Sequence, residues 1–202
     1  LTPLSILLAK RFGFIAYPAP RGWHRKPTPI LGGAALWSSF LIGWLLTPHE
    51  LSRWRFLLAG ATLSFLLGLV DDFFHLKPLI KFLGQLAVVW FVMPSHPVTS
   101  LFFTLLMMNS LNLLDNIDGL AGGVTVIISL GLSSYGFLYG RPEIISPSLV
   151  LAGAAAGFLI YNFHPAKIFM GDCGSLMLGF LLGAIPLAPG RSHGLTPFSV
   201  PG

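Results

Sequence analysis

Long apolar runs, separated by short polar or proline-containing segments, dominate the 202-residue chain. A membrane-spanning helix needs about 20 mostly apolar residues. After a partial helix that ends near Ile15, the pattern predicts about seven full spans, some of them short. Their expected ranges are Ile30–Leu46, Trp54–Val70, Leu79–Met93, Ser100–Leu114, Leu120–Tyr139, Ser148–Phe163 and Ser175–Leu187.

Prolines stand at most of the breaks between these runs, as helix-stopping residues should. They are Pro48, Pro94, Pro97, Pro142, Pro147, Pro165 and Pro189. Lipid offers no partner for free backbone groups, so each span must be helical. The sequence therefore predicts an all-α fold, a polytopic integral membrane helical bundle. We expect residues 1–202 to form a single transmembrane domain, truncated at both ends, because the chain starts at Leu1 inside a helix.

Composition supports the membrane interpretation. The chain is 54% hydrophobic and 9% charged, whereas a soluble domain has about 25% charged residues. The net charge of +5 is accounted for by Lys and Arg in cytoplasmic loops, so no nucleic-acid partner is expected. The single cysteine, Cys173, excludes an internal disulfide framework.

Alternate threading places the charges unevenly. If the loop from Tyr17 to Thr28 is cytoplasmic, the loops Asp71–Pro78, Asp115–Gly119 and His164–Gly174 lie on the same side. Eight basic residues then lie inside: Lys10, Arg11, Arg21, Arg25, Lys26, Lys77, Lys81 and Lys167. Four lie outside: Arg53, Arg55, Arg141 and Arg191.

The acids divide completely between the two sides. All five aspartates fall at inner helix ends: Asp71, Asp72, Asp115, Asp118 and Asp172. Both glutamates, Glu50 and Glu143, fall in outer loops. Ionisable groups at membrane depth are costly and rare unless they have a function. We therefore expect a functional site at the inner face.

The first motif is the adjacent pair Asp71-Asp72 at the end of an apolar helix. Adjacent carboxylates repel, so either one has a raised pKa or a cation neutralises them. The first state suits a base and the second a Mg²⁺ site. Lys77 and Lys81 follow one helical turn apart and are placed to hold phosphate or to pair with Asp72.

Two further motifs carry the other aspartates. Asn112, Asp115 and Asp118 are spaced to share one face if they are helical, and a polar turn is the alternative. Asp172 stands just before a predicted helix, either as a cap or as a metal ligand. The glycines beside it let a phosphate approach backbone N–H groups.

The last motif is the basic segment Arg21–Pro29, which includes Arg25 and Lys26. Cations beside a membrane suit a lipid phosphate or a diphosphate, and simple orientation by charge is the alternative. Carboxylates, lysines and a divalent cation at one site together indicate phosphoryl chemistry.

Four ordered motifs, from about Ile6 to Leu187, resemble those of the polyprenyl-phosphate N-acetylhexosamine-1-phosphate transferases (glycosyltransferase family 4). They are the Asp pair, Asn-x-x-Asp-x-x-Asp-Gly, Phe-Met-Gly-Asp-x-Gly-Ser and the basic segment. The residue sequences of Asn112–Gly123 and Arg21–Pro29 are more similar to the undecaprenyl-phosphate GlcNAc-1-phosphate transferase branch than to the lipid I branch.

The resemblance implies a transferase that moves N-acetylglucosamine 1-phosphate from UDP-GlcNAc, a UDP-N-acetylhexosamine, to undecaprenyl phosphate. It implies release of UMP, the start of cell-envelope polysaccharide synthesis, and a bacterial cytoplasmic membrane with the site on the cytoplasmic side. Mg²⁺ is the implied cofactor, with Mn²⁺ as a substitute. A homodimer is the implied assembly.

The resemblance also implies residue roles. Asp71 and Asp72 are catalytic, and one of them deprotonates the lipid phosphate, whose oxygen attacks the β-phosphorus. Direct attack and a covalent aspartyl intermediate both stay open. Asp172 binds the metal. The substrate-binding residues are Asn112, Asp115, Asp118, Lys77, Lys81, Asn162, Phe169, Arg25 and Lys26.

Other functions stay open at this point. The phospho-MurNAc-pentapeptide transferase that makes lipid I is the alternative within the family. An intramembrane aspartyl protease also needs two membrane aspartates, but it needs neither the lysines nor Asn112. A proton- or cation-coupled transporter would place its carboxylates nearer the bilayer midplane.

Overall fold

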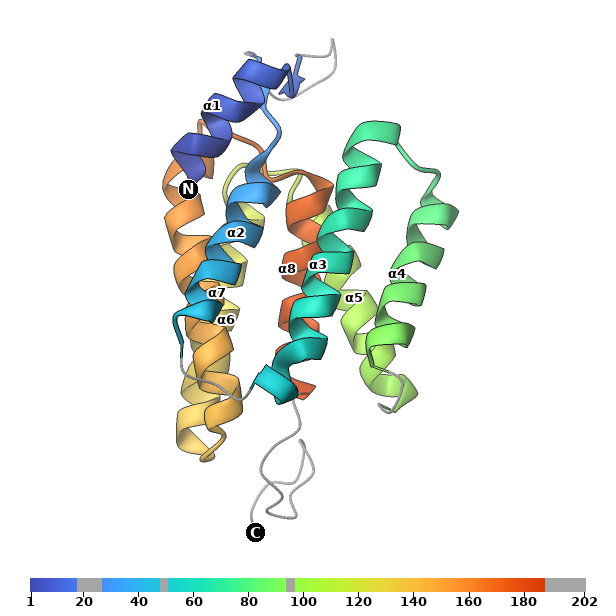
Figure 1. The fold of residues 1–202 in the computed structure, drawn as a ribbon, viewed down its shortest axis with the longest axis vertical. Helices are drawn as coiled ribbons and strands as arrows, with labels where there is room; N and C mark the ends of the chain where they lie inside the picture. The colour runs from blue at the N-terminus through green and yellow to red at the C-terminus, as the bar shows by residue number, and fades with distance from the viewer. Residues whose placement is uncertain (18–26, 48–50, 94–96, 188–202) are drawn as a thin grey trace.

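A computed structural model describes residues 1–17, 27–47, 51–93 and 97–187, with only the backbone described at 51–54. The described part is almost entirely helical, as predicted (Figure 1). Its helices are α1 (Thr2–Phe12), α2 (Gly32–Leu45), α3 (Leu51–Phe74), α4 (Pro78–Val92), α5 (Val98–Leu114), α6 (Leu120–Leu138), α7 (Pro142–Asn162), α8 (Gly171–Ala184) and the 3₁₀ turn η1 (Ile185–Leu187). Two short strands, β1 (Ile15–Ala16) and β2 (Thr28–Pro29), pair antiparallel.

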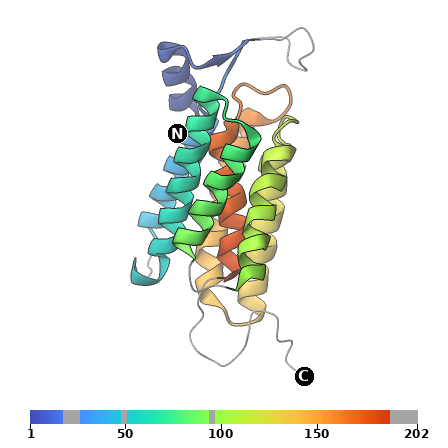
Figure 2. The same cartoon turned by 90° about the vertical axis from the view of Figure 1, so that its right-hand side faces the viewer.

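The helices from α2 to α8 run in alternate directions, so the ends of α3, α5 and α7 meet the starts of α4, α6 and α8 at one end of the bundle (Figure 1). The threading inferred from the sequence is therefore confirmed in its geometry. Helix α8 lies in the middle, packed mainly on α3 and α5 and also on α2, while α6 and α7 pack on each other (Figures 1 and 2).

Central helix α8 is enclosed by its neighbours, and every residue from Cys173 to Ile185 is buried. Lipid tails are as apolar as leucine, so helices associate in a bilayer through close packing and polar contacts. Glycines supply that packing here. Gly60 of α3 lies under the Phe180 ring, while Gly179 and Gly183 of α8 lie against the backbone of α5 at Met108 and Thr104.

The outward faces of the surrounding helices are apolar and exposed, as at Phe91, Phe102, Ile127, Phe137 and Ile160. Such a surface is soluble only in a bilayer, and the protein is membrane-embedded. Three described helices are long and apolar enough to cross a membrane: Arg55–Phe74, Leu120–Leu138 and Pro142–Asn162. The other apolar helices, Gly32–Leu45, Pro78–Val92, Val98–Leu114 and Gly171–Leu187, are shorter, so the expected seven full spans stay a prediction.

Several predicted boundaries were wrong. The first helix ends at Phe12, because Gly13 takes a left-handed conformation (φ 77°) and the chain enters β1. Helix α7 starts at Pro142 and continues through Pro147. A proline this near the helix start removes a single backbone bond, that to the carbonyl four residues earlier. Helix α3 runs past Val70 to Phe74, so the Asp pair lies inside the helix.

We expect the glycine contacts of α8 to be required for stability. A Cβ at Gly179 would collide with the backbone at Met108, whereas Gly131 on exposed α6 has open space around it. Gly179→Ala should destabilise the protein by about 1–3 kcal/mol through overpacking. Gly131→Ala should be neutral or slightly stabilising, because alanine favours a helix. Thermal unfolding of both variants in detergent measures the difference, and equal midpoints would contradict the close approach.

Candidate active site

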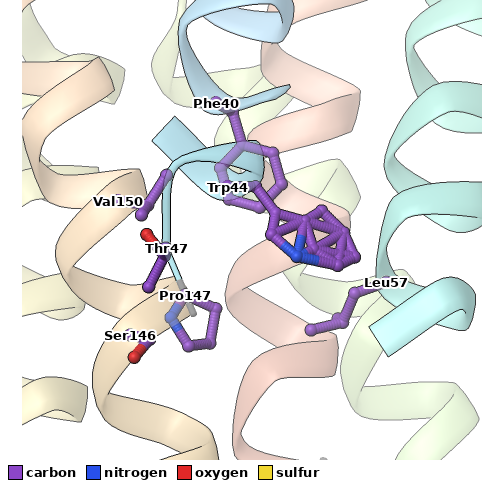
Figure 3. Close-up of a pocket in the computed structure, with 7 residues that line it drawn as sticks. All are labelled: Phe40, Trp44, Thr47, Leu57, Ser146, Pro147 and Val150. Carbon is purple, nitrogen blue, oxygen red and sulfur yellow. The ribbon is translucent and has the colours of Figure 1, made fainter. Parts of the chain in front are cut away.

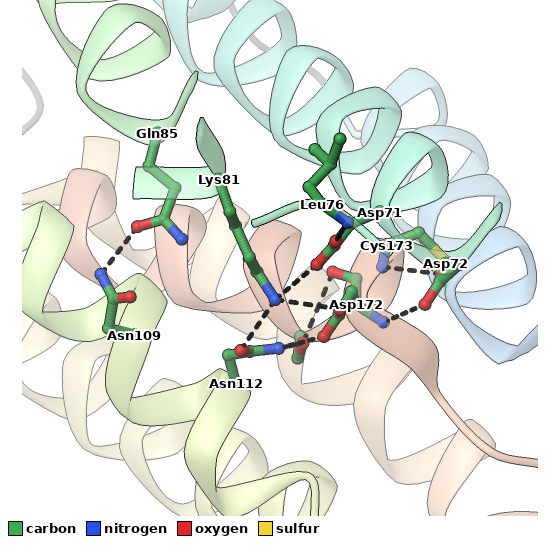
Figure 4. Close-up of polar contacts among 10 residues, drawn as sticks. Asp71, Asp72, Leu76, Lys81, Gln85, Asn109, Asn112, Asp172 and Cys173 are labelled. Atoms are coloured by element: carbon green, nitrogen blue, oxygen red, sulfur yellow. Dashed lines mark hydrogen bonds and ion pairs between the residues drawn. The ribbon is translucent and has the colours of Figure 1, made fainter. Parts of the chain in front are cut away.

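Side chains from three helices surround the ammonium group of Lys81 on a fourth, at the end of the bundle where α3, α5 and α7 finish (Figures 1 and 4). Lys81 of α4 places its Nζ 2.7 Å from Asp71 Oδ2 of α3 and 2.9 Å from Asp172 Oδ2 of α8. The same Nζ donates to Asn112 Oδ1 of α5 over 3.0 Å. We call these four residues the Lys81 cluster. It brings together residues that are up to 101 positions apart in sequence.

Asn112 fixes the α5 side of the cluster. Its Nδ2 donates to Asp172 Oδ1 and, over 2.9 Å, to Ser175 Oγ. Ser175 lies one turn beyond Asp172 on α8 and is completely buried. The amide therefore holds two positions of α8 while its oxygen faces Lys81.

Asp71 is held by its own end of α3. It is 6% exposed, and its Oδ1 accepts from the Leu76 backbone N–H over 2.7 Å. The Oδ2 atom remains for Lys81. The turn that makes this possible has His75 in a left-handed conformation (φ 50°), so the chain reverses directly after α3 and returns as α4.

The two carboxylates of the adjacent pair face different partners. Asp72 accepts from the backbone N–H groups of Asp172 and Cys173, over 2.7 and 3.1 Å. Asp172 itself lies in the first turn of α8 and makes no side-chain cap. The capping alternative considered for Asp172 is therefore not observed, because the helix begins at Gly171, before Asp172, and the capping carboxylate comes from another helix. The metal-ligand alternative stays a prediction.

Asp115 follows α5 directly and is half-buried beside the cluster. Burial raises the pKa of Asp115 well above its usual range, and the nearby carboxylates Asp172, Asp72 and Asp118 raise it further. Asp172 and Asp72, the two carboxylates that act most strongly on the Asp115 pKa, belong to the motifs that were expected at the same face. The convergence of the aspartates at one end of the bundle is thus seen in the structure.

Asp118 bonds to the segment between α7 and α8 and not to Lys81. Its Oδ2 lies 3.0 Å from His164 Nδ1 and accepts from the Ala166 N–H over 3.1 Å. Helix α5 ends at Leu114 and residues 115–119 form a turn, so the shared helical face expected for Asn112, Asp115 and Asp118 does not extend to Asp118. The carboxylate instead shapes the loop between α7 and α8.

Asn162 and Phe169 shape the same loop. Asn162, 3% exposed, accepts from Gly119 N–H over 3.1 Å and donates to Ile168 O over 2.9 Å. The Phe169 backbone bridges to β2 and α2, through Pro29 O and Gly32 N. The expected contacts of both side chains with the nucleotide stay predictions. The amide oxygen and nitrogen of Asn162 are already hydrogen-bonded to backbone groups.

Three predicted binding residues lie apart from the cluster or outside the described residues. Lys77 is exposed at the N-cap of α4 and makes no ion pair with a described residue. Its expected pairing with Asp72 is not observed, because Asp72 faces α8. Arg25 and Lys26 lie outside the described residues.

Sequence reasoning missed Ser175, Gln85 and Asn109. Asn109 Nδ2 donates to Gln85 Oε1 over 2.7 Å, linking α5 and α4 one turn deeper than Asn112 and Lys81 (Figure 4). The signal was present: polar residues at i+3 from Asp172, at i+4 from Lys81 and at i−3 from Asn112, each inside an apolar helix.

The oxygen atoms around Lys81 suit a cation. Within the described part of the chain, no three His, Cys, Asp or Glu side chains form a metal site by themselves. However, Asp71, Asp172 and Asn112 already direct three oxygens at one positive charge. Mg²⁺ is typically held by one or two carboxylates, with substrate phosphates completing its shell, so this donor set fits that ion.

The apolar pocket at the opposite end of the bundle offers no such chemistry. Phe40, Trp44, Leu57, Pro147 and Val150 line it, with Thr47 and Ser146 at its edge (Figure 3). Because no charged side chain lines it, we interpret it as a packing gap between α2, α3 and α7.

The raised pKa of Asp115 leads to a pH prediction. The folded protein holds the Asp115 proton more tightly than the unfolded chain, whose carboxyl has an ordinary pKa of about 3.9. Unfolding therefore releases a proton above that pH, and this group makes stability fall as pH rises until its folded pKa is passed. Asp115→Asn should raise the unfolding midpoint at pH 7–8 in EDTA, with the gain vanishing near pH 4. A loss of stability at every pH would instead identify the carboxylate as a structural acceptor.

Comparison with known proteins agrees with this geometry. Residues 89–189, half of the chain, match the model of glycosyl transferase family 4. The chain is 34% identical over 226 aligned residues to a probable undecaprenyl-phosphate N-acetylglucosaminyl 1-phosphate transferase of Bacillus subtilis, covering 99% of this chain and 62% of the relative.

Two further relatives set the range of similarity. A decaprenyl-phosphate N-acetylglucosaminephosphotransferase of Mycolicibacterium smegmatis is 36% identical over 88% of this chain and 54% of its own length. A phospho-N-acetylmuramoyl-pentapeptide-transferase of Prochlorococcus marinus is 29% identical over 98% of this chain and 67% of its own. The chain spans little more than half the length of the first two relatives. On the family match and these similarities, the chain belongs to glycosyl transferase family 4.

Proposed function

We propose that the protein containing this chain transfers N-acetylglucosamine 1-phosphate from UDP-GlcNAc to undecaprenyl phosphate and releases UMP. The observation that carries the proposal is the Lys81 cluster, which gathers two carboxylates, an amide and a cation at one end of the helical bundle. The names of the Bacillus subtilis and Mycolicibacterium smegmatis relatives support a polyprenyl phosphate acceptor and an N-acetylglucosamine donor.

Each member of the cluster has a role in such a reaction. Asp172, whose carboxylate accepts from Asn112, would hold Mg²⁺, which supplies charge neutralisation for the donor's diphosphate. Lys81 supplies a second positive charge, paired with the carboxylates of Asp71 and Asp172. It is placed to neutralise the oxygens of the lipid phosphate as that group approaches the donor. Positioning and neutralisation of this kind dominate phosphoryl transfer.

Asp71 is the member of the pair assigned to the acceptor. Its Oδ2 faces the cluster while Asp72 faces a backbone. Asp71 takes the remaining proton of the lipid phosphate, and the freed oxygen attacks the β-phosphorus of UDP-GlcNAc. The bond between that phosphorus and the bridging oxygen breaks, and the oxygen leaves with UMP.

The donor is proposed to contact four residues from the connections between helices at this end of the bundle: Asp115, Asp118, Lys77 and Phe169. Asn162 supports them through the turn at Gly119. Basic residues of this end include Lys10, Arg11, Lys77, Lys81 and Lys167. In the described part of the chain these five outnumber the basic residues of the opposite end, Arg53, Arg55 and Arg141. An excess of Lys and Arg on one side supports a cytoplasmic orientation of that side in a bacterial inner membrane, where nucleotide sugars are available.

The alternatives fit less well. The pentapeptide-transferase relative is less similar than the two N-acetylglucosamine relatives, so lipid I synthesis is not favoured. An intramembrane aspartyl protease needs neither Lys81 nor Asn112, yet Lys81 is ion-paired with both Asp71 and Asp172 and Asn112 is bonded to Asp172. A transporter is disfavoured because the carboxylates lie at helix ends rather than midway along the helices.

The reaction is tested with the full-length protein in membranes, supplied with labelled UDP-GlcNAc, undecaprenyl phosphate and Mg²⁺. We expect one UMP for each lipid-linked label. EDTA should abolish transfer, and Mg²⁺ or Mn²⁺ should restore it. Transfer from UDP-MurNAc-pentapeptide with UDP-GlcNAc left unused would overturn the sugar assignment, and no lipid-linked product from either donor would overturn the reaction.

The residue roles are tested by isosteric changes. Asp71→Asn, Asp172→Asn and Lys81→Met should each lower turnover about 100-fold or more, because each removes a charge from the reacting centre. Glu143→Gln is the matched control, since Glu143 pairs with Arg141 at the opposite end of the bundle, and it should retain normal turnover. Normal turnover in all three cluster variants would show that the chemistry occurs elsewhere.

A further inference from the structure

We propose that Asp72 is a positioning residue, whose carboxylate clamps the start of α8 and so sets where Asp172 stands. The proposal rests on the proposed function for its catalytic consequence, but the clamp itself is a property of the fold. It differs from the sequence-based expectation that both members of the Asp pair are catalytic.

Both oxygens of Asp72 are engaged by the first turn of α8. Oδ1 accepts from the N–H of Asp172 over 2.7 Å, and Oδ2 accepts from the N–H of Cys173 over 3.1 Å (Figure 4). These amides have no partner inside their own helix. The residue that precedes α8, Met170, gives no side-chain cap. A carboxylate from α3 therefore supplies the cap across 100 residues of sequence, and the positive end of the helix dipole favours its charge.

The backbone around the clamp is closely packed. Gly68, one turn before Asp72 on α3, lies against the backbone of Asp172 and Cys173. Gly171 has a positive φ of 76°, and a Cβ there would lie 2.8 Å from Asp72 Oδ2. Two glycines thus bring the helices close enough for a side chain as short as aspartate to reach the amides. A glutamate would need one more methylene accommodated in that space.

The clamp and the Lys81 cluster meet on a single residue. Asp172 gives its backbone N–H to Asp72 and its carboxylate to Lys81 and Asn112. Successive residues of an α-helix point about 100° apart, so from the same turn of α3 Asp71 meets Lys81 and Asp72 meets the first backbone amides of α8. Asp71 thereby faces the reacting centre, while Asp72 fixes the position of the carboxylate opposite it.

Backbone hydrogen exchange of the full-length protein tests the clamp directly, in EDTA and without substrates. In Asp72→Asn one acceptor oxygen is replaced by a donor, so peptides containing Asp172 and Cys173 should exchange at least tenfold faster. Glu143→Gln should leave them unchanged. Unchanged exchange in Asp72→Asn would overturn the clamp, whatever the substrate of the enzyme proves to be.

The catalytic consequence is read from the metal requirement. In Asp72→Asn the Mg²⁺ concentration for half-maximal transfer should rise about tenfold, with turnover at saturating Mg²⁺ falling less than in Asp71→Asn. An Asp72→Asn protein whose turnover at saturating Mg²⁺ falls as far as that of Asp71→Asn, with normal exchange and an unchanged Mg²⁺ concentration for half-maximal transfer, would assign Asp72 to the chemistry instead. If this variant does not fold, Asp72→Ser, which adds no volume and lacks the carboxylate that reaches both amides, should show the same faster exchange at Asp172 and Cys173, and unchanged exchange there would overturn the proposal.

Discussion

The contact between Lys81 and the two carboxylates, Asp71 and Asp172, joins three helices at a depth where unpaired charge is costly. Each of these groups alone would be expensive to bury, and removal of one partner of such a set costs several kcal/mol. Asn112 adds a fourth helix through neutral hydrogen bonds. A site made this way depends on the relative placement of α3, α4, α5 and α8. The geometry of the cluster is therefore set by the packing of the bundle.

Helix α8 fixes this placement because it is central and closely packed on its neighbours. Its glycines let α5 approach it closely at Gly179 and Gly183, and Gly60 and Gly68 of α3 do the same from the other side. Because lipid gives no hydrophobic drive for helix association, the order of the bundle comes from these close contacts and from the polar groups at its end. Rigid placement of α8 is what makes one carboxylate, Asp172, usable by two neighbouring helices at once.

Much of this could be predicted from the sequence. Apolar run lengths placed the helices, and alternate threading placed all five aspartates at one end. Helix phase and long-range partners could not be predicted. Whether Asp118 continues the α5 face depends on where that helix stops, and it stops at Leu114. The same holds for Asn162, whose partners are backbone groups of two separate loops.

The adjacent aspartates show how the fold resolves a conflict that the sequence only poses. Two neighbouring carboxylates repel, and the end of α3 is the unfavourable end of its own dipole for both. The structure separates them by the turn of the helix: Asp71 meets the Lys81 ammonium, and Asp72 meets the favourable end of another helix. Each negative charge thus has its own compensation, from a side chain in one case and from backbone amides in the other. A pair of aspartates in this position need not share one function, and here the geometry gives one to the reacting centre and the other to the helix that carries it.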